Sequence, residues 1–193
     1  TTWLHEYLQG MSGQSAPVTF GDLSEQGLSL KVMTTNLTQG RPMAMPWDEK
    51  TFFFDPEVWR SFFPSEVIDW MVDHPDQAVD VDLAARAKEK GLVPLPDPSD
   101  LPILVGIRMS LSFPLLISAV PLQAVDYARS AAPFRTNWFT DGGLCANLPV
   151  HFFDRPLPSC PTFAIDLQGT SRPITDPASG SYLPQKNTDG LAR

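Results

Sequence analysis

The sequence predicts a domain that contains both helices and strands, because strand-like and helix-like stretches follow one another along its 193 residues. Strand patterns lie at 28–37, 115–120 and 162–167, and helix patterns lie at 3–9, 65–71 and 80–90. The apolar run that ends at Thr140 leads into Asp141 and two glycines, which predicts a strand ending in a sharp turn. With 42% hydrophobic and 19% charged residues, the composition is typical of one globular domain.

The N-terminal third should contain one helix and one strand. Trp3, Leu4, Tyr7 and Leu8 recur at helical spacing, and Gly10 and Gly13 then stop the pattern. Over residues 28–32 apolar and polar side chains alternate, and the run Met33 to Leu37 follows, as in a strand that enters a buried environment. The glycine, arginine and proline at 40–42 should end that strand.

Residues 51–71 are dense in aromatic side chains and predict a short strand followed by two short helices. Pro56 after Asp55 suits one helix start, and Ser65 suits the cap of the next. The aromatic side chains could form core or a substrate-facing lid, and the two roles are compatible. Acidic residues then precede basic ones over 80–90, and Gly91 closes that helix.

The apolar window 101–122 is long enough to cross a membrane. Arg108 near its middle and Pro114 within it argue against a spanning helix. We expect a buried helix that begins at Pro102, then a strand over 115–120, and no transmembrane segment in this chain. A core strand should follow at 162–167, and residues 169–193, rich in Pro, Gly and Ser, suit a linker or an extended tail.

Charge and metal-ligand spacing exclude several classes of function. A net charge of −8 disfavours nucleic acid and anionic membranes as partners. Cys145 and Cys160 lack metal-ligand spacing, and both are interpreted as buried thiols. The histidines are scattered, so no metal site and no cofactor are expected.

Asp141 is the best candidate for chemistry in the sequence. It ends an apolar run, and Gly142 and Gly143 permit close approaches that a Cβ would prevent. Asn147 can hydrogen-bond the nearby backbone, and Pro149 suits the first position of a helix. The alternative is a structural Asp-Gly turn with no catalytic role.

Three segments together resemble the C-terminal part of a bacterial patatin-like phospholipase domain. They are Arg108-Met109-Ser110-Leu111-Ser112-Phe113-Pro114, the Asp141-Gly142-Gly143 turn, and Asn147-Leu148-Pro149. Residues 28–37 and 52–63 are also similar to that family. The resemblance implies a partial three-layer α/β/α domain over residues 1–168, with a central, mostly parallel sheet, and a tail over 169–193.

The resemblance also implies a serine lipid acyl hydrolase with a Ser-Asp dyad, which acts on a lipid or another acyl ester. Asp141 matches the dyad aspartate, which would accept the serine proton and return it to the leaving group. Gly142 and Gly143 would let the carboxylate reach that hydroxyl. Asn147 and Pro149 match positions that would hold the turn.

The nucleophile of that family has no match in this sequence. No serine has glycine at both −2 and +2, and no glycine-rich oxyanion loop is present. The chain also begins without a helix cap, as if inside a structural element. We therefore expect a fragment, inactive alone, whose site is completed by an upstream segment of the same protein.

Two alternatives remain open. The chain could be a non-catalytic lipid-binding or interaction domain, and a peripheral membrane contact suits either function. A cytoplasmic or peripheral-membrane location is favoured, although the missing signal peptide carries no information in a fragment.

His151 could complete a triad or serve as a surface or capping residue. A Ser-Asp dyad already contains its base and needs no histidine, which favours a surface or capping role for His151. Arg108 could pair with a buried carboxylate, cap carbonyl groups or bind a phosphate head group.

Overall fold

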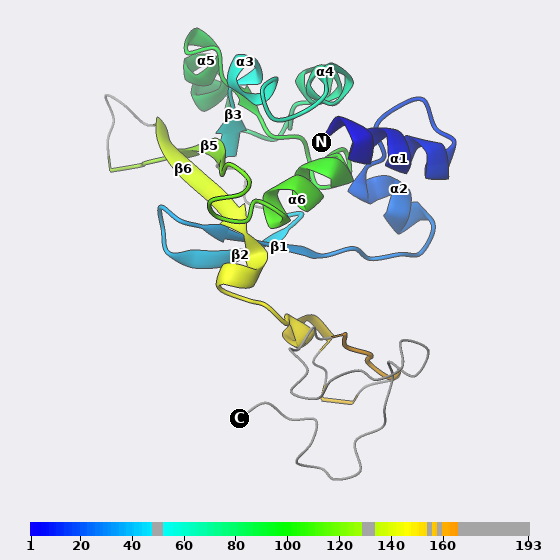
Figure 1. The fold of residues 1–193 in the computed structure, drawn as a ribbon. Helices are drawn as coiled ribbons and strands as arrows, with labels where there is room; N and C mark the ends of the chain where they lie inside the picture. Colours follow the sequence, from blue (N-terminus) through cyan, green and yellow to red (C-terminus); the bar gives the residue numbers. More distant parts are fainter. Residues whose placement is uncertain (48–51, 129–133, 154–155, 158–159, 166–193) are drawn as a thin grey trace, which may run out of the picture. The chain divides into compact units, whose positions relative to one another are not determined.

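The structure is a computed structural model that describes residues 1–47, 52–128, 134–153, 156–157 and 160–165 (Figure 1). The chain divides into two units, Thr1–Pro149 and Val150–Arg193, which are described separately. Asp141 and its turn belong to the first unit.

The described residues of the first unit form a mixed set of helices and strands. The helices are α1 (Thr2–Ser12), α2 (Phe20–Glu25), α3 (Pro56–Trp59), α4 (Ser65–Asp73), α5 (Val81–Glu89), α6 (Ile103–Ser110) and the 3₁₀ turn η1 (Gly142–Leu144). The strands are β1 (Val32–Asn36), β2 (Arg41–Met45), β3 (Phe52–Phe54), β4 (Val93–Pro94), β5 (Val120–Val125) and β6 (Phe134–Asp141).

The strands form a six-stranded sheet in the order β2-β1-β6-β5-β3-β4, and every described pair is antiparallel. The expected mostly parallel sheet of a three-layer α/β/α domain is therefore wrong. Only residues 37–40 join β1 to β2, and only residues 126–133 join β5 to β6. A parallel pair needs a crossover of about a dozen residues or more, so these short connections require antiparallel neighbours.

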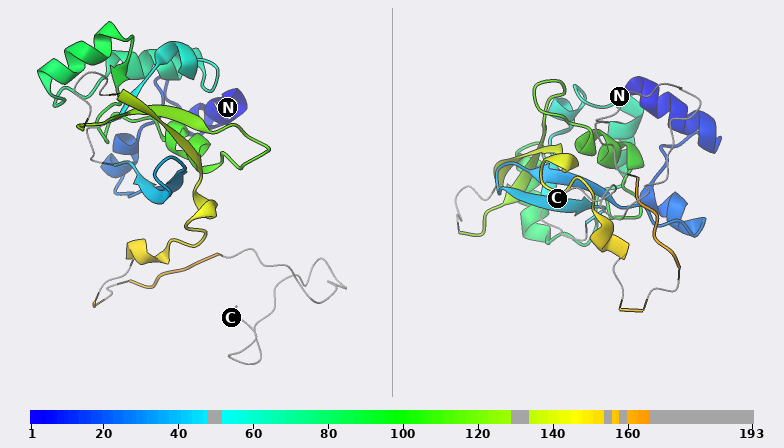
Figure 2. Two further views of the ribbon diagram at one scale, coloured as in Figure 1. Left: turned by 90° about the vertical axis from the view of Figure 1, so that its left-hand side faces the viewer. Right: turned by 60° about the horizontal axis from the view of Figure 1, so that its bottom comes forward.

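Helix α6 packs on the sheet beside β1 and β6 (Figures 1 and 2). Its Leu104 and Met109 are buried in one cluster with Phe139 of β6. Strand β3 alternates between two clusters, since Phe52 and Phe54 join this core and Phe53 packs with Ala87 of α5. Helix α6 therefore brings the residues that follow it to the end of β6, where Asp141 lies.

The aromatic stretch forms the predicted strand and two short helices, and its rings are mostly core. Trp59 is fully buried and donates from Nε1 to the Pro121 carbonyl oxygen at 2.7 Å. Its ring lies 5.1 Å from that of Phe54 and 4.9 Å from that of Phe63. The core interpretation is therefore confirmed for these side chains.

The helix boundaries near charged residues follow the sequence signals. Asp55 caps α3 by accepting from Glu57 N and Val58 N at 3.0 and 3.2 Å, and Pro56 occupies the first helical position. Asp80 accepts from Leu83 N at 3.0 Å and caps α5. Ser65 was expected to cap α4, but it is the first helical residue and no side-chain bond caps that helix.

Two predicted strands and two cysteine assignments are wrong. Residues 115–119 form a loop, and β5 begins only at Val120, while residues 160–165 form no strand. Residues 166–167, like the predicted tail at 169–193, lie outside the described residues. Cys145 and Cys160 are both exposed free thiols, so their interpretation as buried thiols fails.

The apolar window 101–122 does not form one long helix. It contains the eight-residue helix α6, a loop and the start of β5. Among the residues that the structure describes, no helix is long and apolar enough to cross a membrane.

Candidate functional site

Asp141 is the last residue of β6, and the backbone around it is fixed on three sides. Thr34 of β1 pairs with it across the sheet. Its N–H donates to the Ser112 carbonyl oxygen at 3.1 Å, and its carboxylate Oδ1 accepts from Gly143 N at 2.5 Å. Oδ2 accepts no hydrogen bond within the described part of the chain, so this oxygen is available to receive a proton.

Close contacts, rather than unusual backbone angles, distinguish the glycines of the turn: Gly142 lies against the backbone of β1, whereas Gly143 lies against the ends of side chains that can shift. A Cβ at Gly142 would lie 2.2 Å from the Met33 carbonyl oxygen of β1. A Cβ at Gly143 would lie 2.8 Å from Asp141 Oδ1 and 3.3 Å from Asn147 Oδ1. Neither glycine has a positive φ. The sequence thus predicted the close approach correctly, and the turn presses against β1 on one side and the carboxylate on the other.

The two remaining predicted motif residues follow this turn. Ala146 N donates to the Gly142 carbonyl oxygen at 2.9 Å, which closes the turn and brings Asn147 back beside Gly143. Pro149 is the last residue of the first unit, and the 3₁₀ turn η2 (Val150–Phe153) begins one residue later. Asn147 therefore lies next to the Asp141 turn, but its side chain makes no hydrogen bond among the described residues, so its role in holding the turn stays a prediction.

Ser112 links the end of α6 to the Asp141 turn. Its carbonyl oxygen accepts from Asp141 N and also from Thr140 Oγ1, the latter at 2.5 Å. Thr34 Oγ1 donates to the Thr140 carbonyl oxygen at 2.7 Å and extends this network into β1. The structure thus brings together two of the three segments that carried the family resemblance, the one around Ser112 and the one around Asp141.

Arg108 holds the Ser112 segment in place. Its guanidinium donates to the Ser112 hydroxyl and, at 3.1 Å, to the Ser118 carbonyl oxygen. Its Cζ atom lies 5.8 Å from the centre of the Phe62 ring. Partial burial lowers the pKa of the guanidinium, which remains charged at neutral pH. Of the roles open to Arg108, the carbonyl-capping role is the one that the described contacts bear out.

Ser112 and the threonines beside it were not singled out as functional from the sequence. Ser112 stands four residues after Arg108, which is the spacing of neighbours on one helix face, and this signal was available. The Thr140 and Thr34 hydroxyls could not be paired without knowing that β1 and β6 are neighbours. Thr35, also on β1, is 1% exposed, and its hydroxyl has no hydrogen-bond partner among the residues that the structure describes.

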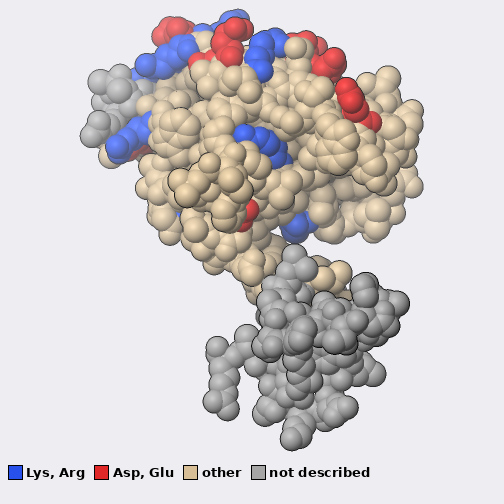
Figure 3. Space-filling model, viewed as in Figure 1, with Lys and Arg blue, Asp and Glu red and all other residues tan. Residues whose placement is uncertain are grey.

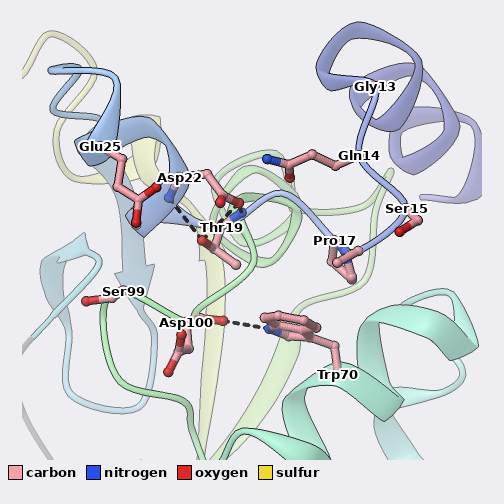
Figure 4. A pocket seen from close by; sticks show the side chains of 12 residues that line it. Gly13, Gln14, Ser15, Pro17, Thr19, Asp22, Glu25, Trp70, Ser99 and Asp100 are labelled. Atoms are coloured by element: carbon pink, nitrogen blue, oxygen red, sulfur yellow. Dashed lines mark hydrogen bonds between the residues drawn. The ribbon is translucent and has the colours of Figure 1, made fainter.

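A cavity of about 550 Å³ lies elsewhere in the first unit, between the loop after α1, helix α2 and Trp70 (Figure 4). Two groups of its polar wall are engaged in internal bonds. Asp22 accepts from the N–H of Thr19 at 2.8 Å in a helix cap, and Trp70 Nε1 donates to the Asp100 carbonyl oxygen at 2.9 Å. Asp141 does not line this cavity, which is therefore separate from the candidate site.

His151 lies outside the unit that carries the candidate site. His151 lies in η2 of the second unit, where its ring centre is 4.6 Å from that of Phe152. No group of His, Cys, Asp and Glu that could hold a metal ion occurs among the described residues.

Replacing Ser112 with Ala should lower the free energy of unfolding by about 1 to 2 kcal/mol, because Arg108 loses a partly buried, charge-assisted hydrogen bond. Urea unfolding followed by circular dichroism measures the change. The control is Ser61→Ala, which removes an exposed hydroxyl bonded to the Val58 carbonyl oxygen and should change stability by less than about 0.5 kcal/mol. Equal effects of the two substitutions would show that Arg108 and Ser112 do not brace this segment.

Comparison with known proteins gives one similarity and two negative results. The chain is 36% identical, over 247 aligned residues, to a protein named RpoH suppressor from Rhizobium meliloti (strain 1021). The match takes in the whole chain but only 38% of that protein, so the chain spans about two fifths of the length of this curated relative. No protein-family model matches the chain, and no solved structure matches it.

Proposed function

We propose that this chain is part of a serine-dependent lipid acyl hydrolase and contributes the aspartate of a Ser-Asp dyad. The observation that carries the proposal is the position of the Asp141 carboxylate. One oxygen accepts from Gly143 N, and the other accepts no hydrogen bond within the described residues, at the end of a strand whose turn has room only for glycine at position 142.

In the proposed reaction Asp141 acts as the general base. As the serine oxygen attacks the ester carbonyl carbon, Oδ2 accepts the hydroxyl proton, and the carboxylic acid then protonates the departing alcohol oxygen. In the second half of the reaction, water attacks the carbonyl carbon of the acyl-serine. The same carboxylate accepts the proton of the water and passes it to the serine oxygen as the fatty acid leaves. The Gly143 N–H keeps the carboxylate oriented through both steps. No metal or cofactor is needed for this sequence of steps.

The nucleophile is proposed to come from a segment of the same protein outside residues 1–193. Within the described part of the chain, no serine hydroxyl hydrogen-bonds Asp141, and the Ser112 hydroxyl is engaged by Arg108. A protein of the relative's length has room for such a segment, since the match leaves most of it uncovered. The name RpoH suppressor states a relation to RpoH and no reaction, so it neither supports nor opposes the proposal.

The antiparallel sheet removes the support that a parallel α/β/α architecture would have lent to this function. What remains is local: the Asp-Gly-Gly turn and the Arg108 to Ser112 segment bonded to it. The proposed substrate is a lipid or another acyl ester rather than nucleic acid. The proposed location is the cytoplasm or a membrane periphery.

A non-catalytic lipid-binding or interaction domain is the second candidate. It is favoured by one observation: no described serine hydroxyl is hydrogen-bonded to Asp141. In that case the turn would have only a structural role, and Gly142 would allow it to pack closely against β1.

Reaction of the intact protein with a fluorophosphonate probe separates the two candidates. The hydrolase should be labelled on one serine, identified by mass spectrometry, and should lose its activity on a soluble acyl ester in parallel. A protein that is folded but neither labelled nor active on the ester would support the non-catalytic domain instead.

A further inference from the structure

The loop between α6 and β5 presents large apolar side chains to solvent. Leu115 is 105% exposed and Leu116 is 81% exposed, and three neighbouring apolar side chains are exposed to a lesser degree: Leu111, Phe113 and Ile117. A soluble domain rarely places so many adjacent apolar side chains on one loop unless the loop contacts something. We call residues 111–117 the apolar loop.

The backbone at Leu115 makes this exposure more notable. Its φ is +72°, a left-handed conformation that glycine adopts readily and that costs energy for a side chain with a γ branch. Among the described residues with a side chain, Leu115 is the one with a positive φ. A glycine would relieve this strain, so stability alone does not account for a leucine at the tip of the loop.

The apolar loop is braced at its base. Arg108 holds the Ser112 hydroxyl and the Ser118 carbonyl oxygen, one at each end of the loop. Within the loop, Leu116 N and Ile117 N both donate to the Phe113 carbonyl oxygen, at 3.2 and 3.0 Å. The exposed tip is therefore held by hydrogen bonds at its base and within it.

Charge indicates what kind of surface the loop would meet. Residues 109–125 contain no Asp, Glu, Lys or Arg, and the whole chain carries a net charge of −8. Figure 3 shows few charged side chains on the face where the loop lies, while charged groups gather over α3, α4 and α5. An uncharged loop on an acidic protein suits an uncharged or zwitterionic surface and disfavours an anionic one.

We propose that the apolar loop inserts into the surface of a zwitterionic lipid layer. Leucine side chains that extend fully into solvent from a braced tip fit into the boundary between head groups and acyl chains, where their burial is favourable. This inference rests on the proposed function. The Ser112 carbonyl oxygen at the base of the loop accepts a hydrogen bond from Asp141 N, so the loop is joined to the proposed catalytic residue. Insertion would therefore bring lipid esters beside the Asp141 turn.

Co-sedimentation of the intact protein with phosphatidylcholine vesicles tests the proposal. The variant Leu115→Gly with Leu116→Ser should bind these vesicles at least about tenfold more weakly, since it lacks the two leucine side chains that are proposed to be buried in the lipid layer. Its thermal stability should not fall, because the glycine relieves the strain at position 115. The control Val81→Ser removes an 81% exposed apolar side chain from α5 and should leave vesicle binding unchanged.

Several outcomes would overturn the inference. These are no binding of the unaltered protein to phosphatidylcholine vesicles, equal binding by the loop variant, and binding only to vesicles that contain phosphatidylglycerol. A fourth is a dimer, measured by light scattering, that the loop variant abolishes, since the loop would then contact a second copy. Hydrolysis of a soluble ester is measured separately. If the unaltered protein hydrolyses the ester but does not bind the vesicles, the loop proposal fails and the proposed function stands. If it binds the vesicles but does not hydrolyse the ester, the proposed function fails and the loop proposal stands.

Discussion

Replacing Asp141 with Asn in the intact protein should lower kcat for a soluble acyl ester by about 10² to 10⁴ or more, the range over which a positioned general base contributes. The asparagine amide cannot accept the serine proton. KM should change little, because the carboxylate is proposed to act on the nucleophile rather than on the bound ester.

The substitution is suited to this test because it preserves the turn. An asparagine Oδ1 can still accept from Gly143 N, as the aspartate does at 2.5 Å. Asp97→Asn is a matched control, since Asp97 Oδ1 accepts from Ser99 N at 3.0 Å in a similar arrangement away from the candidate site. The control should retain its full turnover. Near-normal kcat in the Asp141 variant would remove Asp141 from the mechanism.

Replacing Gly142 with Ala should lower the free energy of unfolding by about 3 kcal/mol, as expected when a methyl group is forced into closely packed atoms. The new Cβ would lie 2.2 Å from the Met33 carbonyl oxygen and 2.8 Å from the Met33 Cβ. Because the first contact is backbone, relief requires β1 or the turn to move. Urea unfolding of the variant measures the loss.

Gly10→Ala is the control for Gly142→Ala. Gly10 lies within α1, where a Cβ would meet nothing within 4 Å. An alanine there should raise stability by about 0.5 to 1 kcal/mol, because glycine is unfavourable inside a helix. If the two alanine variants proved equally stable, the Asp141 turn would not be held against β1 as the structure has it.

Local signals in the sequence predicted most helices correctly. Asp55 with Pro56 and Asp80 with Gly91 mark helix boundaries through hydrogen bonds and backbone angles that depend only on neighbouring residues. The strand that ends at Asp141 was predicted for a similar reason, since its apolar run stops at the two glycines.

The pairing of strands was not predictable from the same signals. Strand β2 was missed because Gly40 and Pro42 were interpreted as the end of a strand, whereas an edge strand tolerates proline. Strand β5 also contains a proline, Pro121. The residues of β5 that pair with β3 are Gln123 and Ala124, so the missing N–H of Pro121 does not disrupt the pairing with β3. Strand direction depends on such pairings, and for this reason the predicted parallel sheet was wrong.

The end of the apolar loop, residues 115–117, was interpreted as part of a strand because hydrophobicity was taken as a sign of burial. Leu115, Leu116 and Ile117 are apolar but exposed, and a single sequence cannot distinguish an exposed contact loop from a core strand. Asp141 and its two glycines were found from the sequence. The Ser112 carbonyl oxygen that bonds Asp141 N required the structure, because a backbone group leaves no mark in the sequence.

The rate of fluorophosphonate labelling of the intact protein, compared with that of its Asp141→Asn variant, tests the central claim most directly. If Asp141 is the base of a Ser-Asp dyad, one serine of the unaltered protein should be labelled, and the variant should label at that serine at least about 100-fold more slowly. Equal labelling rates in the two proteins, or labelling of no serine in the folded protein, would contradict the assignment of Asp141 as the catalytic base.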